Sequence, residues 1–231
     1  MKGVKVIGFD ADDTLWVNEP FYREAEGRFV DLIAAYGVED DIASALFATE
    51  ISNLKLYGYG IKAFMLSLTE CAIRLTEGRV EARTISEIIG IGKDMLQRPI
   101  ELLDYVKEVL EALAPHYRLI VATKGDLLDQ EGKMKRSSIS RYFHHIEVMS
   151  DKTTVHYELL LKHLDIEAEA FLMIGNSMRS DILPPLELGS MAIHVPFHTT
   201  WAHEEVEEDP RSDKFFRVDR LKEVLELIPF C

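Results

Sequence analysis

The chain has 231 residues, of which 47% are hydrophobic and 29% charged, as in an ordinary globular protein that buries a substantial core. The formal net charge of −14 argues against a nucleic-acid partner and against an anionic membrane surface, because both require a basic face. A small anionic substrate is still compatible with this charge, since one or two local cations and a metal ion are enough to hold it.

Cysteine occurs only at Cys71 and Cys231, which gives neither a disulfide framework nor a zinc-binding spacing and indicates a reducing compartment. The amino terminus carries no signal-peptide pattern, and no apolar run approaches the length that spans a membrane. We therefore expect a cytoplasmic protein.

The chain begins with a short apolar run that predicts a β-strand and leads directly into Asp10 and Asp12. From Asn18 to about Gln97 the pattern is helical, and no convincing strand interrupts it. The first of these helices has apolar residues at helical spacing, and further helices are predicted over 41–56, 61–75 and 84–96. This region is predicted to be an all-helical insert placed directly after the first strand.

Strands and helices alternate after Pro99. Strands are predicted over 117–123, 146–149, 171–175, 191–195 and, as an edge strand, 215–218, and helices over 102–113, 156–164 and 221–227. This order predicts an α/β fold with a doubly wound, mostly parallel, Rossmann-like sheet. We expect a core domain of residues 1–17 and 98–231 and a helical domain of residues 18–97. The acidic run His203–Asp209 is interpreted as a solvated loop or the start of a helix, and His144-His145 as the start of a strand.

Polar residues that suit one active site follow four of the predicted strands. They are Asp10 and Asp12 after the first, Thr123 and Lys124 after the second, Lys152 after the third, and Asn176, Ser180 and Asp181 after the fourth. The carboxyl ends of parallel strands lie along one edge of a sheet, so we expect these side chains to converge. Carboxylates, a hydroxyl and an ammonium together suit the hydrolysis of a phosphate ester.

The motifs and their order resemble those of the haloacid dehalogenase superfamily. They are Asp10-x-Asp12-x-Thr14-Leu15, Thr123 after a strand, Lys152, and Gly175-Asn176-x-x-x-Ser180-Asp181. The resemblance covers essentially the whole chain, because the helical insert lies where this superfamily places its helical cap, of the type called C1. It implies an α/β core with a cap that closes over the site and selects the leaving group.

The resemblance also implies a role for each residue. Asp10 is the nucleophile that forms an aspartyl-phosphate, and Asp12 is the acid and base. Thr123 and Lys152 bind the phosphoryl group. Mg²⁺ is held by the Asp10 carboxylate, the Asp12 backbone carbonyl and the fourth motif, with Asn176 and Asp181 as the candidate ligands there. Lys124, beside Thr123, could share the binding of phosphate.

Asp12 favours a phosphatase over a dehalogenase, because an alkoxide leaving group needs a proton and a halide does not. Asn176 departs from the superfamily pattern, in which this position is usually Asp. An amide oxygen can still bind Mg²⁺ but brings no charge, so either Asn176 binds it more weakly or Asp181 takes a larger share.

The predicted activity is therefore Mg²⁺-dependent hydrolysis of a small phosphate monoester. A dehalogenase, a phosphomutase and a non-catalytic protein that binds Mg²⁺ or a phosphorylated metabolite are the alternatives. A sugar phosphate, a nucleoside monophosphate and phosphoglycolate all remain open as substrates, and the oligomeric state is left open.

Overall fold

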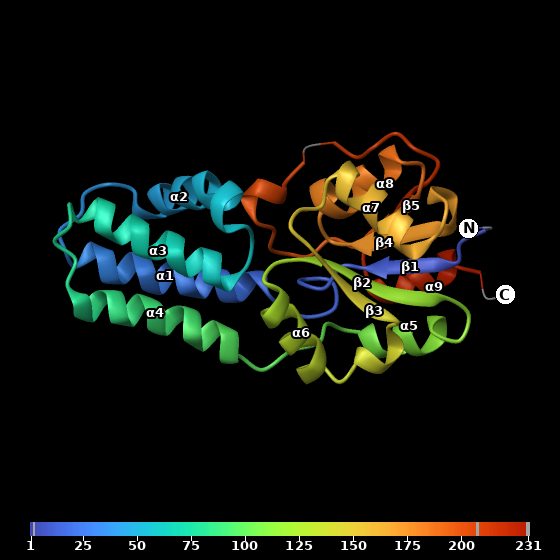
Figure 1. Ribbon diagram of the computed structural model, residues 1–231, viewed down its shortest axis with the longest axis horizontal. Helices are drawn as coiled ribbons and strands as arrows, with labels where there is room; N and C mark the ends of the chain where they lie inside the picture. Colours follow the sequence, from blue (N-terminus) through green and yellow to red (C-terminus); the bar gives the residue numbers. More distant parts are fainter. Residues whose placement is uncertain (2, 207, 230–231) are drawn as a thin grey trace. The chain divides into compact units, whose positions relative to one another are not determined.

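The structure is a computed structural model of the chain and describes residues 1, 3–206 and 208–229. The chain divides into two compact units. The α/β unit consists of Met1–Glu19, Ile100–Lys124 and Gln130–Cys231, and the helical unit of Pro20–Pro99 and Gly125–Asp129. The helices α1–α4 of the helical unit follow directly after strand β1, as predicted for a cap of the C1 type (Figure 1).

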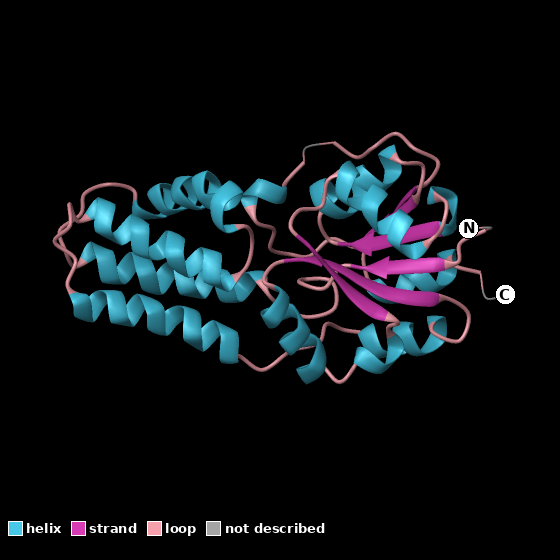
Figure 2. Ribbon diagram, viewed as in Figure 1, coloured by secondary structure: helices cyan, strands magenta, loops and turns pink. Residues whose placement is uncertain are grey.

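Six parallel strands form the sheet of the described α/β unit, in the order β3-β2-β1-β4-β5-β6 (Figure 2). The strands are β1 (Val6–Phe9), β2 (Arg118–Lys124), β3 (His145–Met149), β4 (Phe171–Gly175), β5 (Met191–His194) and β6 (Phe215–Arg217). The chain begins in the middle of the sheet, builds outward to β3 and then returns to the other side of β1. A parallel sheet with this order has its topological switch point at β1, where ligands bind.

Alternating side chains of the strands face two separate cores. On one face, Ile7, Phe9 and Val121 pack in the core that includes helices α5 (Val106–Leu113) and α9 (Val224–Leu227) and Met134 of α6 (Leu127–Arg136). On the other face, Val6 and Ile120 pack with helix α7 (Thr154–Leu164). Both faces of the strands are therefore covered, which explains why these strands consist of continuous apolar runs.

The helical unit has its own core, built from one apolar stripe on each of four helices. They are α1 (Glu19–Ala34), α2 (Ile42–Tyr57), α3 (Ile61–Leu75) and α4 (Ala82–Gln97). On α1 the buried residues Ala25, Phe29 and Ile33 recur every four positions, which places them on one face. Asp41 accepts a hydrogen bond from the Ser44 amide at 3.1 Å and so caps the start of α2.

The predicted α/β class and the helical insertion after the first strand are confirmed. The sequence analysis missed α6. The five residues before α8 (Leu183–Glu187), Met178–Ile182, form a π-helix. No helix of the described ranges is both long and apolar enough to cross a membrane. Cys71 is buried with a free thiol, and Cys231 lies outside the described residues.

Candidate active site

The register of the sheet brings the predicted motifs to one edge. Phe9 of β1 lies opposite Val121 of β2 and Ile174 of β4. The next residue, Asp10, therefore leaves the strand beside Gly175, and its amide donates to the Ile174 carbonyl at 2.9 Å. The side chains that follow β1, β2 and β4 thus start from the same level of the sheet, at the carboxyl edge.

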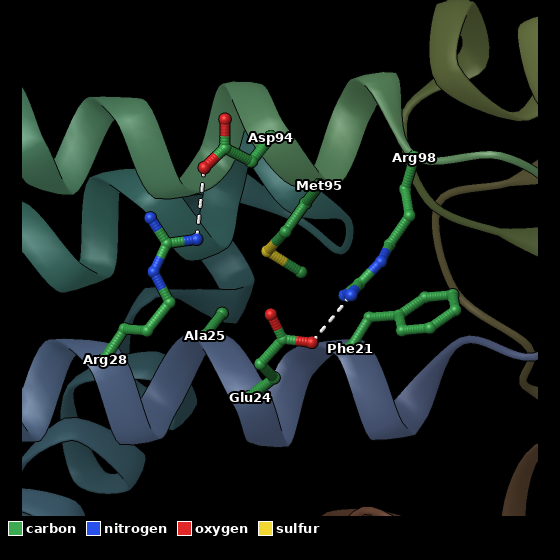
Figure 3. Close-up of a pocket in the computed structure, with 7 residues that line it drawn as sticks. All are labelled: Phe21, Glu24, Ala25, Arg28, Asp94, Met95 and Arg98. Atoms are coloured by element: carbon green, nitrogen blue, oxygen red, sulfur yellow. Dashed lines mark hydrogen bonds and ion pairs between the residues drawn. The ribbon is translucent and has the colours of Figure 1, made fainter.

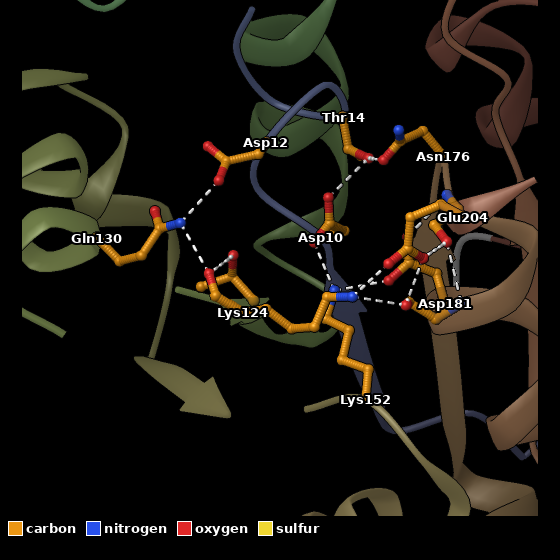
Figure 4. A network of polar contacts seen from close by, with 12 residues as sticks. Asp10, Asp12, Thr14, Lys124, Gln130, Lys152, Asn176, Asp181 and Glu204 are labelled. Carbon is orange, nitrogen blue, oxygen red and sulfur yellow. Dashed lines mark hydrogen bonds and ion pairs between the residues drawn. The ribbon is translucent and has the colours of Figure 1, made fainter. Parts of the chain in front are cut away.

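Lys152 joins two of the predicted acids. Its Nζ lies 2.5 Å from Asp10 Oδ1 and 2.6 Å from Asp181 Oδ1, and all three side chains are buried (Figure 4). The predicted nucleophile, cation and metal-ligand candidate therefore form one cluster. One ammonium therefore serves two carboxyl groups in this cluster.

The charges in this cluster depend on burial and on one another. Burial raises the pKa of Asp10, Lys152 opposes that rise, and the neighbouring Asp181 adds to it. Burial alone would lower the pKa of Lys152, but Asp10 and Asp181 outweigh it and raise the pKa, so the ammonium stays charged. A further cation beside Asp10 would hold its carboxylate in the ionised form that a nucleophile requires.

Asn176 completes a set of oxygens that suits such a cation. Its Oδ1 lies 3.3 Å from Asp10 Oδ2 and 3.2 Å from the Asp12 carbonyl, and both of these atoms are also acceptors. Without a cation, rotation of the amide would satisfy the site better, because its nitrogen would then donate to both. In the present orientation, no proton lies between Asn176 Oδ1 and either of these two oxygens. The three oxygens together are a donor set that fits a hard divalent ion.

Asp181 has a different position from Asn176. Its Oδ1 accepts from Lys152, and its Oδ2 accepts from the Ser177 amide at 2.9 Å. The carboxylate packs directly against Gly175, where a Cβ atom would lie 2.3 Å from Asp181 Oδ2. The glycine of the fourth motif is therefore required by the close approach of this carboxylate to the strand.

Asp12 points to a separate group of donors. Its Oδ1 accepts from Trp16 Nε1 at 2.7 Å and lies 3.0 Å from Lys133 Nζ, and its Oδ2 accepts from Gln130 at 2.8 Å. Burial raises the pKa of Asp12, but Lys133 and the hydrogen bonds outweigh this effect and lower it. In this arrangement Asp12 is ionised and thus able to accept a proton.

Asp13 and Thr14 shape the turn that presents these acids. Asp13 has a left-handed backbone, with φ of 62°, and its carboxylate accepts from the amides of Asn18 and Glu19 at 2.8 and 2.9 Å. Thr14 Oγ1 lies 3.3 Å from Asp10 Oδ2. Asp13 thus stabilises the turn through hydrogen bonds to nearby backbone amides, as acids in turns commonly do. Thr14 instead contacts Asp10, the candidate nucleophile.

Thr123 and Lys124 lie at the end of β2, the strand that pairs with β1. Thr123 is buried, and its hydroxyl donates to the Lys124 carbonyl at 3.2 Å. Lys124 Nζ lies 2.5 Å from Glu204 Oε1 and 2.9 Å from Ser180 Oγ. Glu204 also accepts from Ser177 and Ser180, and although burial raises its pKa, Lys124 and these bonds lower it to about 2.

Three residues of this region, Gln130, Lys133 and Glu204, were missed by the sequence analysis. Glu204 belongs to the acidic run that was predicted to be a solvated loop or the start of a helix. It lies in the short 3-10 helix Ala202–Glu204, but its side chain is 11% exposed and paired with a lysine, so the expectation of a solvated side chain is wrong for Glu204. Gln130 and Lys133 lie three residues apart on α6, so they share one helix face. The three-residue spacing of these two polar residues was the sequence feature from which a polar helix face at this position could have been predicted.

The helical unit has a small pocket of about 170 Å³ between α1 and α4 (Figure 3). Its two arginines are paired, Arg28 with Asp94 at 3.1 Å and Arg98 with Glu24 at 2.7 Å. Each of these cations therefore already has an acidic partner. The chemistry of the described residues is concentrated at the carboxyl edge of the sheet.

Comparison with known proteins places this arrangement in a family. Residues 4–189 match the haloacid dehalogenase-like hydrolase family. A haloacid dehalogenase-like family hydrolase from Xanthomonas campestris has a similar structure, with a TM-score of 0.86 and 39% identity over 96% of this chain and 88% of that chain. The family match extends over β1–β4 and the helical insert, and the structural match covers 96% of this chain.

Two further relatives are more distant. A glyceraldehyde 3-phosphate phosphatase from Methanocaldococcus jannaschii is 25% identical over 97% of both chains. A HAD hydrolase from Bacillus subtilis, whose structure was determined with bound magnesium, has a TM-score of 0.65 and 15% identity over 98% of this chain and 99% of that chain. The latter similarity is one of fold alone.

Proposed function

We propose that this chain, which belongs to the haloacid dehalogenase-like hydrolase family, is a magnesium-dependent phosphatase that hydrolyses a small phosphate monoester through an aspartyl-phosphate on Asp10. The observation that carries the proposal is the contact of Asp10 Oδ1 with Lys152 Nζ at 2.5 Å, with a second carboxylate, Asp12, two residues further on. Nucleophile, cation and acid or base are then all supplied by strand ends of one sheet.

The two carboxylate oxygens of Asp10 have different surroundings, which indicates that they have different roles. Oδ2 faces Asn176 and Thr14, whereas Oδ1 contacts Lys152. We assign Oδ1 as the oxygen that attacks phosphorus, while the bond from phosphorus to the ester oxygen breaks. Lys152 beside it offsets the repulsion between two anions and stabilises charge on the phosphoryl oxygens.

Asp12 gives a proton to the departing alkoxide and later accepts one from the water that hydrolyses the aspartyl-phosphate. Its ionised state, maintained by Lys133 and Gln130, is the form needed for the second of these steps. The first step requires Asp12 to take up a proton, which weakens its contact with Lys133. A halide would need no such proton, so a carboxylate in this position supports phosphate-ester cleavage.

Magnesium is the proposed cofactor because the donor set consists of oxygens. Asp10 Oδ2, the Asp12 carbonyl and Asn176 Oδ1 would hold it, and Asp181 would support it from the side of Lys152. When bound, the ion supplies positive charge that keeps Asp10 ionised and stabilises the phosphoryl oxygens. The position of Asn176 beside Asp10 Oδ2 supports its role as a ligand although it brings no charge.

The substrate proposed is a small phosphorylated metabolite, and a triose phosphate is the first candidate because of the archaeal relative's activity. Thr123 and Lys124 are proposed to border the bound substrate, with Lys124 held in place by Glu204. Residues 18–97 are proposed to act as the cap domain that selects the leaving group, and residues 1–17 and 98–231 as the catalytic core.

The test is phosphate release from a panel of sugar, triose and nucleoside phosphates and phosphoglycolate, with Mg²⁺ or with EDTA. Wild type, Asp10→Asn and the neighbouring turn variant Asp13→Asn are compared, each checked for folding by circular dichroism. We expect Mg²⁺-dependent release in wild type, and its loss in folded Asp10→Asn by at least about 1,000-fold. Full turnover by Asp10→Asn would reject the mechanism, and turnover unaffected by EDTA would reject the cofactor.

Release of halide from a haloacid, or transfer of the phosphoryl group back to the substrate, would favour one of the two enzymatic alternatives. Product analysis by chromatography separates a mutase from a phosphatase. Saturable binding without turnover across the panel would favour the binding protein.

A further inference from the structure

Three potential metal ligands meet at the amino half of the sheet, away from the catalytic edge. His145 and Glu147 are the first and third residues of β3, so they lie on one face of this edge strand. His163 lies at the end of α7. One ligand atom from each of these residues lies within 4.8 Å of the other two.

The distances suit an ion at the centre of this group. Glu147 Oε2 lies 3.5 Å from His145 Nε2 and 3.2 Å from His163 Nδ1. Ligands that bind zinc tetrahedrally at 2.0–2.2 Å lie about 3.3–3.6 Å from one another. Both distances to Glu147 therefore match this spacing, and the ligand atoms of His145 and His163 lie within 4.8 Å of each other.

The hydrogen bonds of the neighbouring histidine indicate which nitrogen of His145 is unprotonated. Arg118, which can only donate, lies 3.5 Å from His144 Nδ1, so this nitrogen acts as an acceptor. His144 Nδ1 is also 3.0 Å from His145 Nδ1, and we assign the proton of this bond to His145 Nδ1. His145 Nε2 is left with a lone pair, is buried, and has no hydrogen-bond partner among the described residues.

This pattern is the one that metal-ligating histidines show. Such a histidine donates its other ring N–H to a neighbouring acceptor, and this bond fixes the tautomer and the orientation of the ring. His163 is 67% exposed, so an ion can reach the group from solvent.

We propose that His145, Glu147 and His163 bind a zinc-type divalent transition-metal ion, with water in the fourth position. Two imidazoles and one carboxylate favour such an ion over Mg²⁺, which prefers an all-oxygen set. The ion links the edge strand β3 to the end of α7. His145 and Met149 at the two ends of β3 are about 13 Å apart, and Lys152 follows Met149, so this site is distinct from the catalytic one.

The experiment is calorimetric titration of the full, metal-stripped chain with ZnCl2 in excess Mg²⁺, which occupies the catalytic oxygens. His163→Ala and Glu147→Gln remove single ligands at partly exposed positions, and His156→Ala, on the same helix outside the group, is the matched control. We expect a Mg²⁺-insensitive zinc site in wild type and in His156→Ala. We expect a loss of affinity of at least about 10-fold in each ligand variant.

Cobalt provides a second readout that does not depend on stability or activity. Tetrahedral Co²⁺ bound to wild type should give intense visible absorption, which both ligand variants lose and His156→Ala keeps. Zinc affinity in His163→Ala and Glu147→Gln equal to that of wild type would overturn the proposal. So would the absence of any zinc site that survives excess Mg²⁺.

Discussion

Replacing Glu204 by Gln removes the negative charge that neutralises Lys124. The two side chains are 11% and 14% exposed and lie 2.5 Å apart, so water screens this pair only weakly. The pKa of Glu204 falls from an ordinary 4.5 to about 2 in the folded protein. A difference of one between the folded and unfolded pKa values corresponds to about 1.4 kcal/mol. The ionised carboxylate of Glu204 therefore stabilises the fold by about 3 kcal/mol at neutral pH.

The sign of the pH dependence follows from this difference. Because the folded pKa is the lower one, the stabilisation is fully present above about pH 4.5 and is lost as the pH falls towards about 2. By about pH 3 more than half of it has gone. The difference in stability between wild type and Glu204→Gln should therefore be largest at neutral pH and should shrink as the solution becomes acidic.

Urea unfolding followed by circular dichroism at several pH values measures this difference. The matched control is Glu205→Gln, which removes the same charge from the exposed neighbouring residue and should change stability by less than about 0.5 kcal/mol. In a double-mutant cycle with Lys124→Met, a coupling energy well above that of an exposed pair is expected. A Glu204→Gln variant as stable as Glu205→Gln at pH 7 would refute the reasoning.

Three further predictions concern the catalytic edge. Gly175→Ala places a methyl group on the Asp181 carboxylate, so we expect kcat to fall by at least about 10-fold in a protein that remains folded; unchanged kcat would contradict the packing argument. Asp12→Asn should reduce turnover of alkyl phosphates by about 100–10,000-fold. The rate of the single-turnover burst with an aryl phosphate should fall much less, because its leaving group needs no proton. Equal losses for the two substrates would argue against proton transfer by Asp12. Asn176→Asp adds a negative charge to the proposed magnesium ligands and should lower the half-saturating Mg²⁺ concentration, whereas Asn176→Ala should raise it. A Mg²⁺ titration that neither substitution changes would place the ion elsewhere.

The parts of the fold that were predictable are those in which apolar residues carry the signal. The strands β1, β2 and β4 are buried on both faces and therefore appear as continuous apolar runs. The helix α6 was missed because its pattern is inverted. Leu127 and Leu128 are 58% and 71% exposed, whereas Gln130 and Lys133 are buried. A periodicity analysis that assigns apolar residues to the interior cannot find such a helix.

The candidate site was predictable where a residue follows a strand. Asp10, Lys152 and Asp181 were expected to converge from the parallel topology, and Lys152 contacts both acids. Gln130 and Lys133, which contact Asp12, and Glu204, which pairs with Lys124, were not predictable in this way. They come from a helix face and from the short 3-10 helix Ala202–Glu204 after β5, and Glu204 lies 80 positions after its lysine, so only the three-dimensional fold brings them together.

The central claim, a phosphoryl group carried by Asp10, can be tested by mass spectrometry of the intermediate. Asp12→Asn is mixed with Mg²⁺ and p-nitrophenyl phosphate, whose leaving group needs no proton, and is quenched in acid within the first turnover. Because the variant lacks the base for hydrolysis, the account predicts an added phosphoryl group on the peptide that contains Asp10, absent from the Asp10→Asn protein. Release of nitrophenol with no phosphoryl group on Asp10, or with one on another residue, would contradict it.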